Sequence, residues 1–317
     1  MVFALLRQGV ESWRIRRATQ RWEREQNALK ARLVEADDFA WCVHPQDGKA
    51  CLKRVGGLDI SFFSDGGHPD DDRACVALIV CEFDEARETM EVVWKDFKFI
   101  RMTEPYIAGY LAFREAPHYC AMLRRLQEAR PDLVPEVILV DGNGVLHYRG
   151  FGVASHVGVL SGQCTIGVAK NLLMVDGLER GVIRDRCAET PSKPVPLVGD
   201  SGRVWGAAVL PRPRKPLSKA SPPSKNPIYI SVGHRVGLDS CSEIVRLCLL
   251  SARVPEPVRL ADVLSREQVR MVVEQEEKKT SGLAGHWLLP SGRGKLLPPS
   301  VAALAVLGVA GALAAWR

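Results

Sequence analysis

The amino-acid sequence predicts an α/β protein in which helices flank a mixed β-sheet. Three β-like runs follow one another at 55–63, 74–83 and 90–100, with a short polar stretch between the first two, which is typical of an antiparallel meander. Nearly continuous apolar runs, EVILVDG at 136–142 and CTIGVAK at 164–170, come later, as expected for strands covered on both faces. Helical patterns separate and follow these later strands, which completes the case for this fold class.

The remaining elements are predicted from the spacing of apolar residues. A helix is expected from about Ile107 to Glu128, and the segment HVGVLSGQ should form a short helix before CTIGVAK. Two further strands and two further helices complete the prediction, at 205–210, 228–236, 240–252 and 257–278.

The domain organisation follows from composition. Residues 37–278 are expected to form one main domain, preceded by a basic amphipathic helix within 1–36 and followed by a variable tail at 279–317. The Pro/Lys-rich segment 211–227 should be an exposed flexible loop between the last two strands. This loop either contacts a nucleic-acid backbone or is solvated and idle.

The tail ends in an apolar segment, 300–316, that is sixteen residues long. A membrane span needs about 20 residues, so we expect a loosely packed or disordered terminus, with a tail anchor as the lesser alternative. The first residues carry too short an apolar run for a secretory signal. Nine cysteines without any Cys-x-x-Cys spacing indicate a reducing compartment. A cytoplasmic and nuclear protein is therefore expected.

The composition is that of a folded protein with a mild positive charge. Of 317 residues, 46% are hydrophobic and 25% are charged, so most of the chain should fold. Lysines and arginines number 43, against 37 aspartates and glutamates. This balance tolerates a polyanionic partner without requiring one, and it gives nucleic acid only a modest advantage over a neutral substrate.

Three acidic residues stand where a fold usually excludes charge. Asp59 lies inside the strand-like run GGLDISFF, Asp141 ends VILVD, and Glu115 lies in the helical segment GYLAFREAP. Burying a lone carboxylate costs several kcal/mol unless it is paired or coordinated. Taken singly, Asp59 could cap a turn, and Asp141 could be an ordinary turn former before Gly-Asn-Gly.

Taken together, the three acids point to metal-assisted chemistry. Converging carboxylates repel one another, so a cation is their natural partner, and oxygen ligands favour Mg²⁺ or Mn²⁺. Two such metals about 4 Å apart can promote hydrolysis of a phosphodiester. An aspartate within the first strand, another at the end of a later strand and an acid on a helix is the layout of the ribonuclease H-like superfamily.

Longer motifs resemble a particular family of that superfamily, the endonuclease V family. The resemblance runs from about Trp22 to about Val273, about four-fifths of the chain, and its most specific part is DGNGxxHxRGFGxAxHxG. The motifs stand in the family's order: VGGLDISF, PYIAGYLAFRE, ILVDGNGVLHYRGFGVASHVG, IGVAKNLL, PLVGDSG, YISVGHRV and PEPVRLAD.

The resemblance implies a ribonuclease H-like fold and a Mg²⁺-dependent endonuclease, with Mn²⁺ as a substitute metal. Its metal acids would be Asp59, Glu115, Asp141 and Asp262, all of which match motif positions. The family cuts the second phosphodiester 3′ of inosine and leaves a 3′-hydroxyl and a 5′-phosphate. Because of its length and the insertion at 211–227, the sequence looks nearer the vertebrate-like members, which implies inosine-containing RNA as substrate, with deaminated DNA as an alternative. A monomer in the cytoplasm and nucleus, the nucleolus included, is the accompanying expectation.

The segment PYIAG resembles the wedge of the family, which follows the third strand. The resemblance implies that Tyr106, flanked by Pro105 and Ile107, stacks where a flipped base has left the strand, and one such stack is worth about 1–3 kcal/mol. Bacterial wedges usually read Pro-Tyr-Ile-Pro, whereas Ala108 stands here, which removes rigidity. The alternative is that Tyr106 only begins a helix after Pro105.

The resemblance also implies a pocket whose main-chain groups read the flipped base. Glycines allow the backbone to approach a ligand closely, although some of them could serve only as turn residues. The pocket glycines would be Gly142, Gly144, Gly150 and Gly152.

Basic side chains near these motifs complete the candidate site. Lys170, at the end of IGVAK, either pairs with the scissile phosphate or a metal-bound water, or forms a salt bridge with Asp141. His147 and Arg149 are candidates for contacts with the nucleic-acid backbone. His234, in SVGHR, either supports the site or donates to a phosphate, or is a core histidine.

Two other functions remain open at this point. The first is a catalytically idle relative that only binds inosine or RNA, which the complete acid set disfavours. The second is a recombination-type nuclease that recognises structure rather than a base, which the PYIAG and DGNG…RGFG motifs disfavour. RNA and DNA share their phosphates and differ locally at the 2′-hydroxyl, so the sequence leaves this choice open.

Overall fold

The computed structural model describes a large part of the chain, and it divides the chain into two units, Met1–Val272 and Val273–Arg317. No helix among the described residues is long and apolar enough to cross a membrane. The apolar segment 300–316 and most of the predicted loop 211–227 lie outside the described residues. Side chains are described between residues 15 and 279, and the described ranges are 2–44, 50–64, 71–84, 89–211, 224, 226–250 and 252–285.

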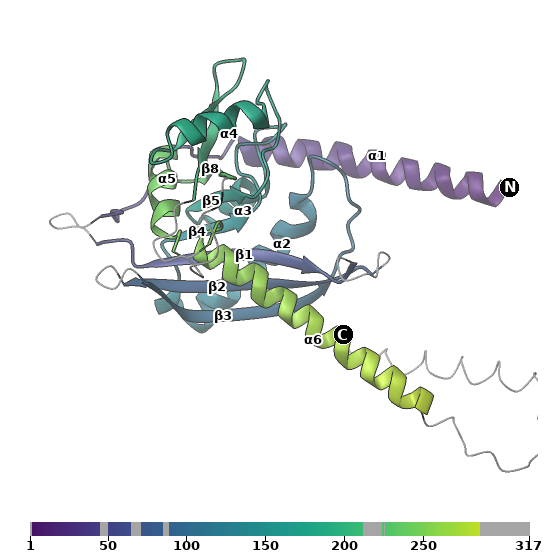
Figure 1. Cartoon of the computed structure of the whole chain (residues 1–317). Helices are drawn as coiled ribbons and strands as arrows, with labels where there is room; N and C mark the ends of the chain where they lie inside the picture. The colour runs from purple at the N-terminus through teal and green to yellow at the C-terminus, as the bar shows by residue number, and fades with distance from the viewer. Residues whose placement is uncertain are drawn as a thin grey trace, which may run out of the picture. The chain divides into compact units, whose positions relative to one another are not determined.

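The described strands form a single eight-stranded sheet in the order β3-β2-β1-β4-β5-β8-β7-β6 (Figure 1). The strands are β1 (Arg54–Phe62), β2 (Arg73–Asp84), β3 (Thr89–Arg101), β4 (Val137–Asp141), β5 (Thr165–Ala169), β6 (Val195–Val198), β7 (Val204–Val209) and β8 (Ile228–His234).

The directions of the strands decide where functional residues can meet. β1, β2 and β3 form the expected antiparallel meander, while β1, β4 and β5 run parallel to one another. β8 then runs antiparallel to β5, and β7 and β6 continue the alternation. The carboxyl ends of β1, β4 and β5 therefore lie at one edge of the sheet, and the carboxyl end of β8 lies at the opposite edge.

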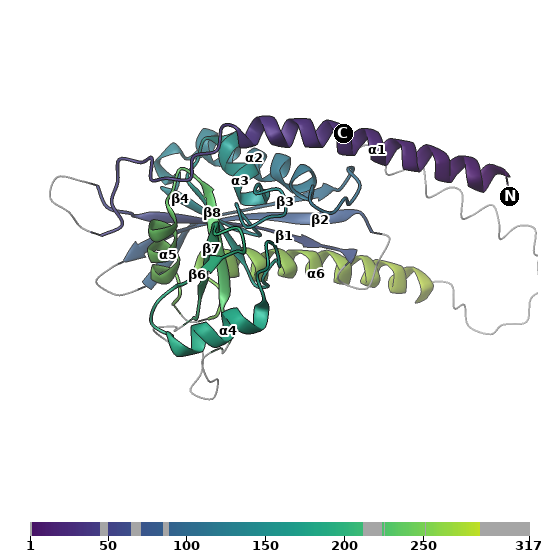
Figure 2. The ribbon, with the colours of Figure 1, turned by 90° about the horizontal axis from the view of Figure 1, so that it is seen from above.

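Helices cover both faces of the sheet (Figure 2). Helices α2 (Ala112–Ala129) and α3 (Val153–Ser161) pack on one face, against apolar residues of β1, β2 and β4. On the other face lie α5 (Leu238–Leu247) and the first part of α6 (Glu256–Gly285). The ribonuclease H-like α/β fold class expected from the sequence is confirmed.

Two helices differ in extent from the sequence prediction. Helix α1 spans Val2–Lys30 and ends before Leu33 and Val34, which instead belong to the segment that joins it to the sheet. Helix α2 begins at Ala112 rather than Ile107, because Gly109 adopts a positive φ of 83° that interrupts a helix.

The sequence prediction also missed two short elements, α4 (Arg180–Glu189) and β6. Helix α4 buries only Ile183 and Cys187, which is too little for a clear apolar periodicity. Strand β6 has four residues and contains Pro196. A proline is tolerated there because β6 is at the edge of the sheet.

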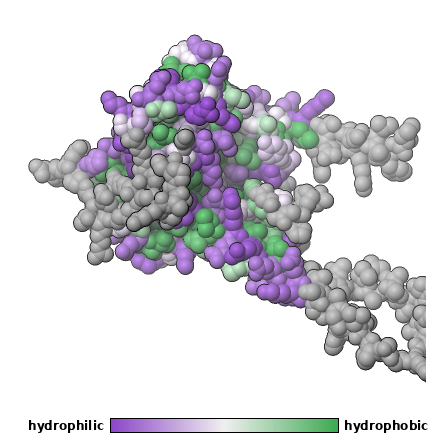
Figure 3. All heavy atoms as spheres, in the orientation of Figure 1, coloured by the Kyte–Doolittle hydropathy of each residue, from purple (hydrophilic) through white to green (hydrophobic). Residues whose placement is uncertain are grey.

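The second unit is described only up to Gly285, as the continuation of α6. Residues 274–279 of this helix are exposed and read EQEEKK. Hydrophilic residues cover the corresponding stretch of the space-filling view, before the grey atoms begin (Figure 3). This stretch presents no apolar face.

Candidate active site

The parallel pairing of β1 and β4 brings two of the predicted acids together. The register pairs Leu58 with Val140, so Asp59 and Asp141 are the next residues on neighbouring strands. Asp59 is only 6% exposed. Burial, the negative charges of Asp141 and Asp262, and a side-chain hydrogen bond with Asp141 raise the pKa of Asp59 well above its usual value.

Two helices supply the other acids. Glu115 is buried in the first turn of α2, and burial together with the charge of Asp141 raises its pKa to about 8. Asp262 lies on α6. This helix packs directly on β1, because Gly57 has no side chain: a Cβ there would overlap the backbone of Pro257. All four predicted acids therefore converge at the carboxyl edge of β1 and β4.

Lys170 follows β5 and joins this cluster. Its Nζ donates to Asp141 Oδ2 and to Asp262 Oδ2, at 2.9 Å in each case. Burial lowers the pKa of Lys170, but the two aspartates outweigh this and the pKa is raised overall. Of the roles considered for Lys170, the ion pair with Asp141 is present, and Asp262 shares it.

The donor set is chemically suited to a hard divalent cation. It consists of carboxylate oxygens, which hard cations prefer. Burial and the neighbouring carboxylates raise the pKa values of Asp59 and Glu115. Among the described residues, no three His, Cys, Asp or Glu side chains are already grouped as a ligand set. Part of the space between Asp141 and Asp262 is taken by the ammonium of Lys170.

An open cavity of about 490 Å³ lies beside the acids and is lined by Asp59, Glu115 and Asp141. We call residues 105–111 the wedge loop and residues 142–152 the pocket loop, because both contribute to its wall. Tyr106 lines the cavity and is 68% exposed. It does not begin a helix, since α2 starts six residues later.

The predicted pocket glycines divide into two pairs. Gly142 and Gly152 line the cavity, and Gly142 has a φ of 135°, which a residue with a side chain rarely adopts. Gly144 is buried and its N–H donates to Ser231 Oγ at 2.9 Å, so it packs the loop against β8. Gly150 is not among the lining residues and is approached by the Lys30 side chain.

The two basic residues of the pocket loop differ in their surroundings. His147 lines the cavity, and burial, with the nearby charges of Arg149 and Lys30, lowers the pKa of its imidazole to about 4. His147 is therefore neutral at pH 7. The guanidinium of Arg149 instead contacts α1, with bonds to Gln26 Oε1 (2.5 Å) and Asn27 Oδ1 (3.2 Å).

Three predicted contacts lie away from the cavity. His234 ends β8, whose direction places it at the opposite edge of the sheet, where it is buried and its Nδ1 accepts from the N–H of Val34. The core-histidine reading is the one that matches the structure. Ile107 packs against Trp22, and Pro105 is exposed but is not a lining residue.

The cavity wall contains residues that the sequence prediction missed. Tyr119 is buried and lines the cavity together with the acids, while Tyr148, within the pocket loop, is 64% exposed. Asn143 lines the cavity and its buried Oδ1 has no hydrogen-bond partner among the described residues. Tyr148 and Asn143 both stand within the motif DGNGVLHYRG, so the motif was the available signal, whereas Tyr119 gave none beyond its helical spacing.

Carboxylates at the carboxyl edge of a ribonuclease H-like sheet, beside an open cavity with aromatic residues, define a nuclease that hydrolyses phosphodiester bonds. The endonuclease V family model matches residues 38–263. The chain belongs to the endonuclease V family.

Relatives and solved structures agree with this assignment. Human endonuclease V is 44% identical over 252 residues, which cover 78% of this chain and 82% of that protein. Its crystal structure has a TM-score of 0.70 at 43% identity and covers 80% of this chain and 99% of that one. The endonuclease V of Ciona intestinalis, in complex with a 23mer DNA that contains an inosine followed by a ribo-adenosine, has a TM-score of 0.68 at 30% identity and covers 81% and 98%.

Proposed function

We propose that this nuclease is Mg²⁺-dependent and cuts inosine-containing single-stranded RNA at the second phosphodiester 3′ of the inosine, with deaminated DNA as a second substrate class. The products would carry a 3′-hydroxyl and a 5′-phosphate. The convergence of Asp59, Glu115, Asp141 and Asp262 beside a cavity wide enough for a base carries this proposal. It is supported by the Ciona intestinalis relative, which was solved with inosine-containing DNA.

Asp59, Asp141, Glu115 and Asp262 would hold the cation, with Mn²⁺ as a substitute. When bound, the cation stabilises negative charge on the phosphate oxygens during hydrolysis. Lys170 supplies a positive charge at the same edge, where its ammonium can donate to a phosphate oxygen. The complete acid set disfavours the idle inosine-binding alternative.

The two loops would recognise the substrate. Tyr106 presents an exposed ring that can stack on a base, while the pocket loop offers main-chain groups at Gly142 and Gly152. Because His147 is neutral at pH 7, we expect it to act by hydrogen bonding rather than as a cation for phosphate.

The proposal is tested with matched RNA and DNA oligonucleotides that contain one inosine, each with an adenosine control, in Mg²⁺. We expect cleavage of the inosine strands only, faster for RNA, at the second phosphodiester 3′ of the inosine. Product mass and end chemistry identify the cut. Equal cleavage of the adenosine controls would contradict the proposed specificity, and faster cleavage of DNA would contradict the RNA preference.

Replacing Tyr106 tests the stacking role. We expect Tyr106→Ala to weaken binding or turnover on inosine RNA by about 1–3 kcal/mol, the value of one base stack. Tyr106→Phe should be nearly silent, because stacking needs the ring and not the hydroxyl. Binding titrations and single-turnover rates on the same RNA provide the measurement. If Phe were as damaging as Ala, Tyr106 would act through its hydroxyl.

Deleting residues 296–317 tests the tail. We expect cleavage to stay at the level of the full chain, because the matched family residues and the cavity all lie earlier in the sequence. We propose a cytoplasmic and nuclear location, so the full chain should be mostly in the soluble fraction after carbonate extraction. Carbonate-resistant membrane association that disappears on deletion would instead establish a tail anchor.

A further inference from the structure

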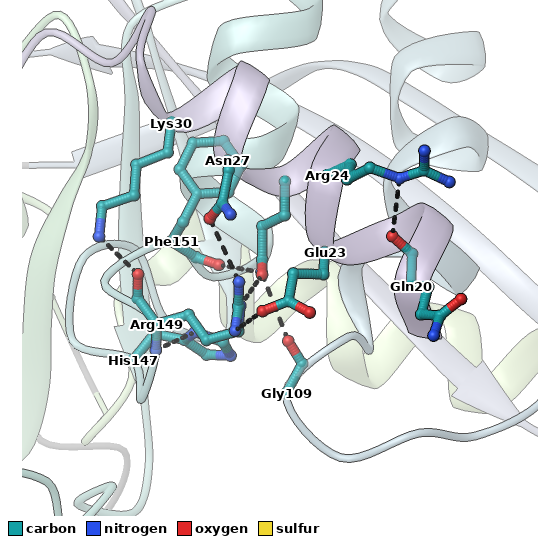
Figure 4. A network of polar contacts seen from close by, with 10 residues as sticks. Gln20, Glu23, Arg24, Asn27, Lys30, Gly109, His147, Arg149 and Phe151 are labelled. Atoms are coloured by element: carbon teal, nitrogen blue, oxygen red, sulfur yellow. Dashed lines mark hydrogen bonds and ion pairs between the residues drawn. The ribbon is translucent and has the colours of Figure 1, made fainter. Parts of the chain in front are cut away.

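The inner face of α1 lies against both loops that line the cavity (Figure 4). We propose that Gln26 on this helix is a positioning residue that holds the wedge loop and the pocket loop in a fixed relation. The inference rests on the proposed function. Gln26 lies outside the residues 38–263 that the family model matches.

All the polar groups of the Gln26 side chain are engaged, and the residue is only 1% exposed. Its Nε2 donates to the carbonyl oxygen of Phe151 at 2.9 Å, in the pocket loop, and to the carbonyl oxygen of Gly109 at 3.4 Å, in the wedge loop. Its Oε1 accepts from Arg149 Nε at 2.5 Å. A single amide thus joins the two loops and orients Arg149 of the pocket loop.

Neighbouring residues of α1 hold each loop separately. Trp22 is stacked on Phe113, with ring centroids 5.1 Å apart, and its cluster includes Tyr110 and Ile107 of the wedge loop. Lys30 Nζ donates to the carbonyl oxygen of Arg149 at 2.6 Å in the pocket loop. These contacts hold the loops against α1, but of these residues only Gln26 contacts both loops by hydrogen bonds.

The relative position of the two loops matters because both would act in the same step, the flipping of a base out of the strand. Tyr106 on the wedge loop would take the place of a base that the pocket loop receives. A displacement of one loop by about 1 Å can cost about a hundredfold in rate when reacting groups must meet in one geometry. Residues that fix such loops from behind are therefore expected to control turnover without touching the substrate.

The test uses the full chain, two variants of Gln26 and one control variant. Gln26→Met keeps a similar volume and removes all three hydrogen bonds. Gln26→Glu keeps the acceptor for Arg149 but loses the N–H groups that bond the two carbonyl oxygens. Gln20→Met is the matched control, because Gln20 is exposed on the same helix. Each protein is assayed for kcat and KM on inosine RNA, and for the fluorescence of a 2-aminopurine placed next to the inosine.

We expect both Gln26 variants to lower kcat/KM by about ten- to a hundredfold and to reduce the rise in fluorescence that reports base unstacking, while Gln20→Met behaves as the wild type. If Gln26 had only a structural role, its replacement would lower the melting temperature. The 2-aminopurine fluorescence of the folded protein bound to RNA would then stay unchanged. If Gln26→Met does not fold, Gln26→Glu decides the outcome.

The inference would be overturned if Gln26→Glu had the same fluorescence and the same kcat/KM as the wild type. It would also be overturned if Gln26→Met matched the control Gln20→Met in both measurements. Failure of the proposed function would give a different result, because the wild-type protein itself would then cleave inosine RNA no better than adenosine RNA.

Discussion

Replacing Asp141 with Asn is expected to lower cleavage of inosine RNA by several orders of magnitude while the protein stays folded. The carboxylate ends β4 and is next to Asp59 on the neighbouring strand. Asparagine keeps the shape and the turn but removes the charge that would bind the metal, so the stabilisation of charge on the phosphate is lost. Binding of the RNA should remain, because Tyr106 and the pocket loop are unchanged.

The fold should survive this substitution because the ion pair of Lys170 with Asp262 remains and the repulsion among the acids decreases. Lys170 loses one charged partner but keeps Asp262. One of the two neighbouring negative charges that, after burial, raise the pKa of Asp59 is removed. We expect the melting temperature without Mg²⁺ to equal or slightly exceed that of the wild type. Asp132→Asn, at an exposed ion pair, is the matched control and should cleave normally. Cleavage by Asp141→Asn at the normal rate would end the catalytic assignment, and unfolding would favour a structural role at the turn.

Removal of divalent metal is expected to abolish cleavage completely. The reason is that four acids with a single shared lysine cannot present positive charge to a phosphate by themselves. EDTA should stop the reaction, and added Mg²⁺ or Mn²⁺ should restore it. Ca²⁺ is expected to support binding only, because it is larger and takes more ligands than Mg²⁺.

The measurement is a cleavage time course after exhaustive dialysis against chelator, followed by stepwise addition of each metal. Binding of the same RNA is followed in parallel, which separates loss of chemistry from loss of affinity. Cleavage that persists in excess chelator would remove the metal from the mechanism, although the family membership would stand.

The sheet and its main helices were predictable because their apolar patterns are strong. Strands β1, β2, β4 and β5 are mostly buried, so their apolar runs are visible in the sequence. Strand β3 has no buried residue, and its β-like run was the signal. Helix α4 was missed because it buries only two residues, which gives a weak apolar periodicity. Strand β6 was missed because it is short and contains a proline.

The candidate site was predictable in part for a similar reason. Asp59 and Asp141 were visible as charges inside apolar strands, and their parallel strands make them meet. His234 also ends a strand, but the direction of β8 depends on pairing between distant segments, which the sequence pattern does not state. The contacts of Arg149 with α1, and those of Gln26 with the two loops, join residues more than eighty positions apart, so they required the structure.

Gly57 has a consequence for how this protein can evolve. It carries no chemistry, yet any side chain there would collide with the backbone of Pro257, at the start of the helix that bears Asp262. A lineage that lost this glycine would lift the helix from the strand and separate Asp262 from Asp59 without altering either acid. Selection on catalysis should therefore constrain residue 57 as tightly as the acids themselves, and a pseudoenzyme could arise from this position with its full acid set intact.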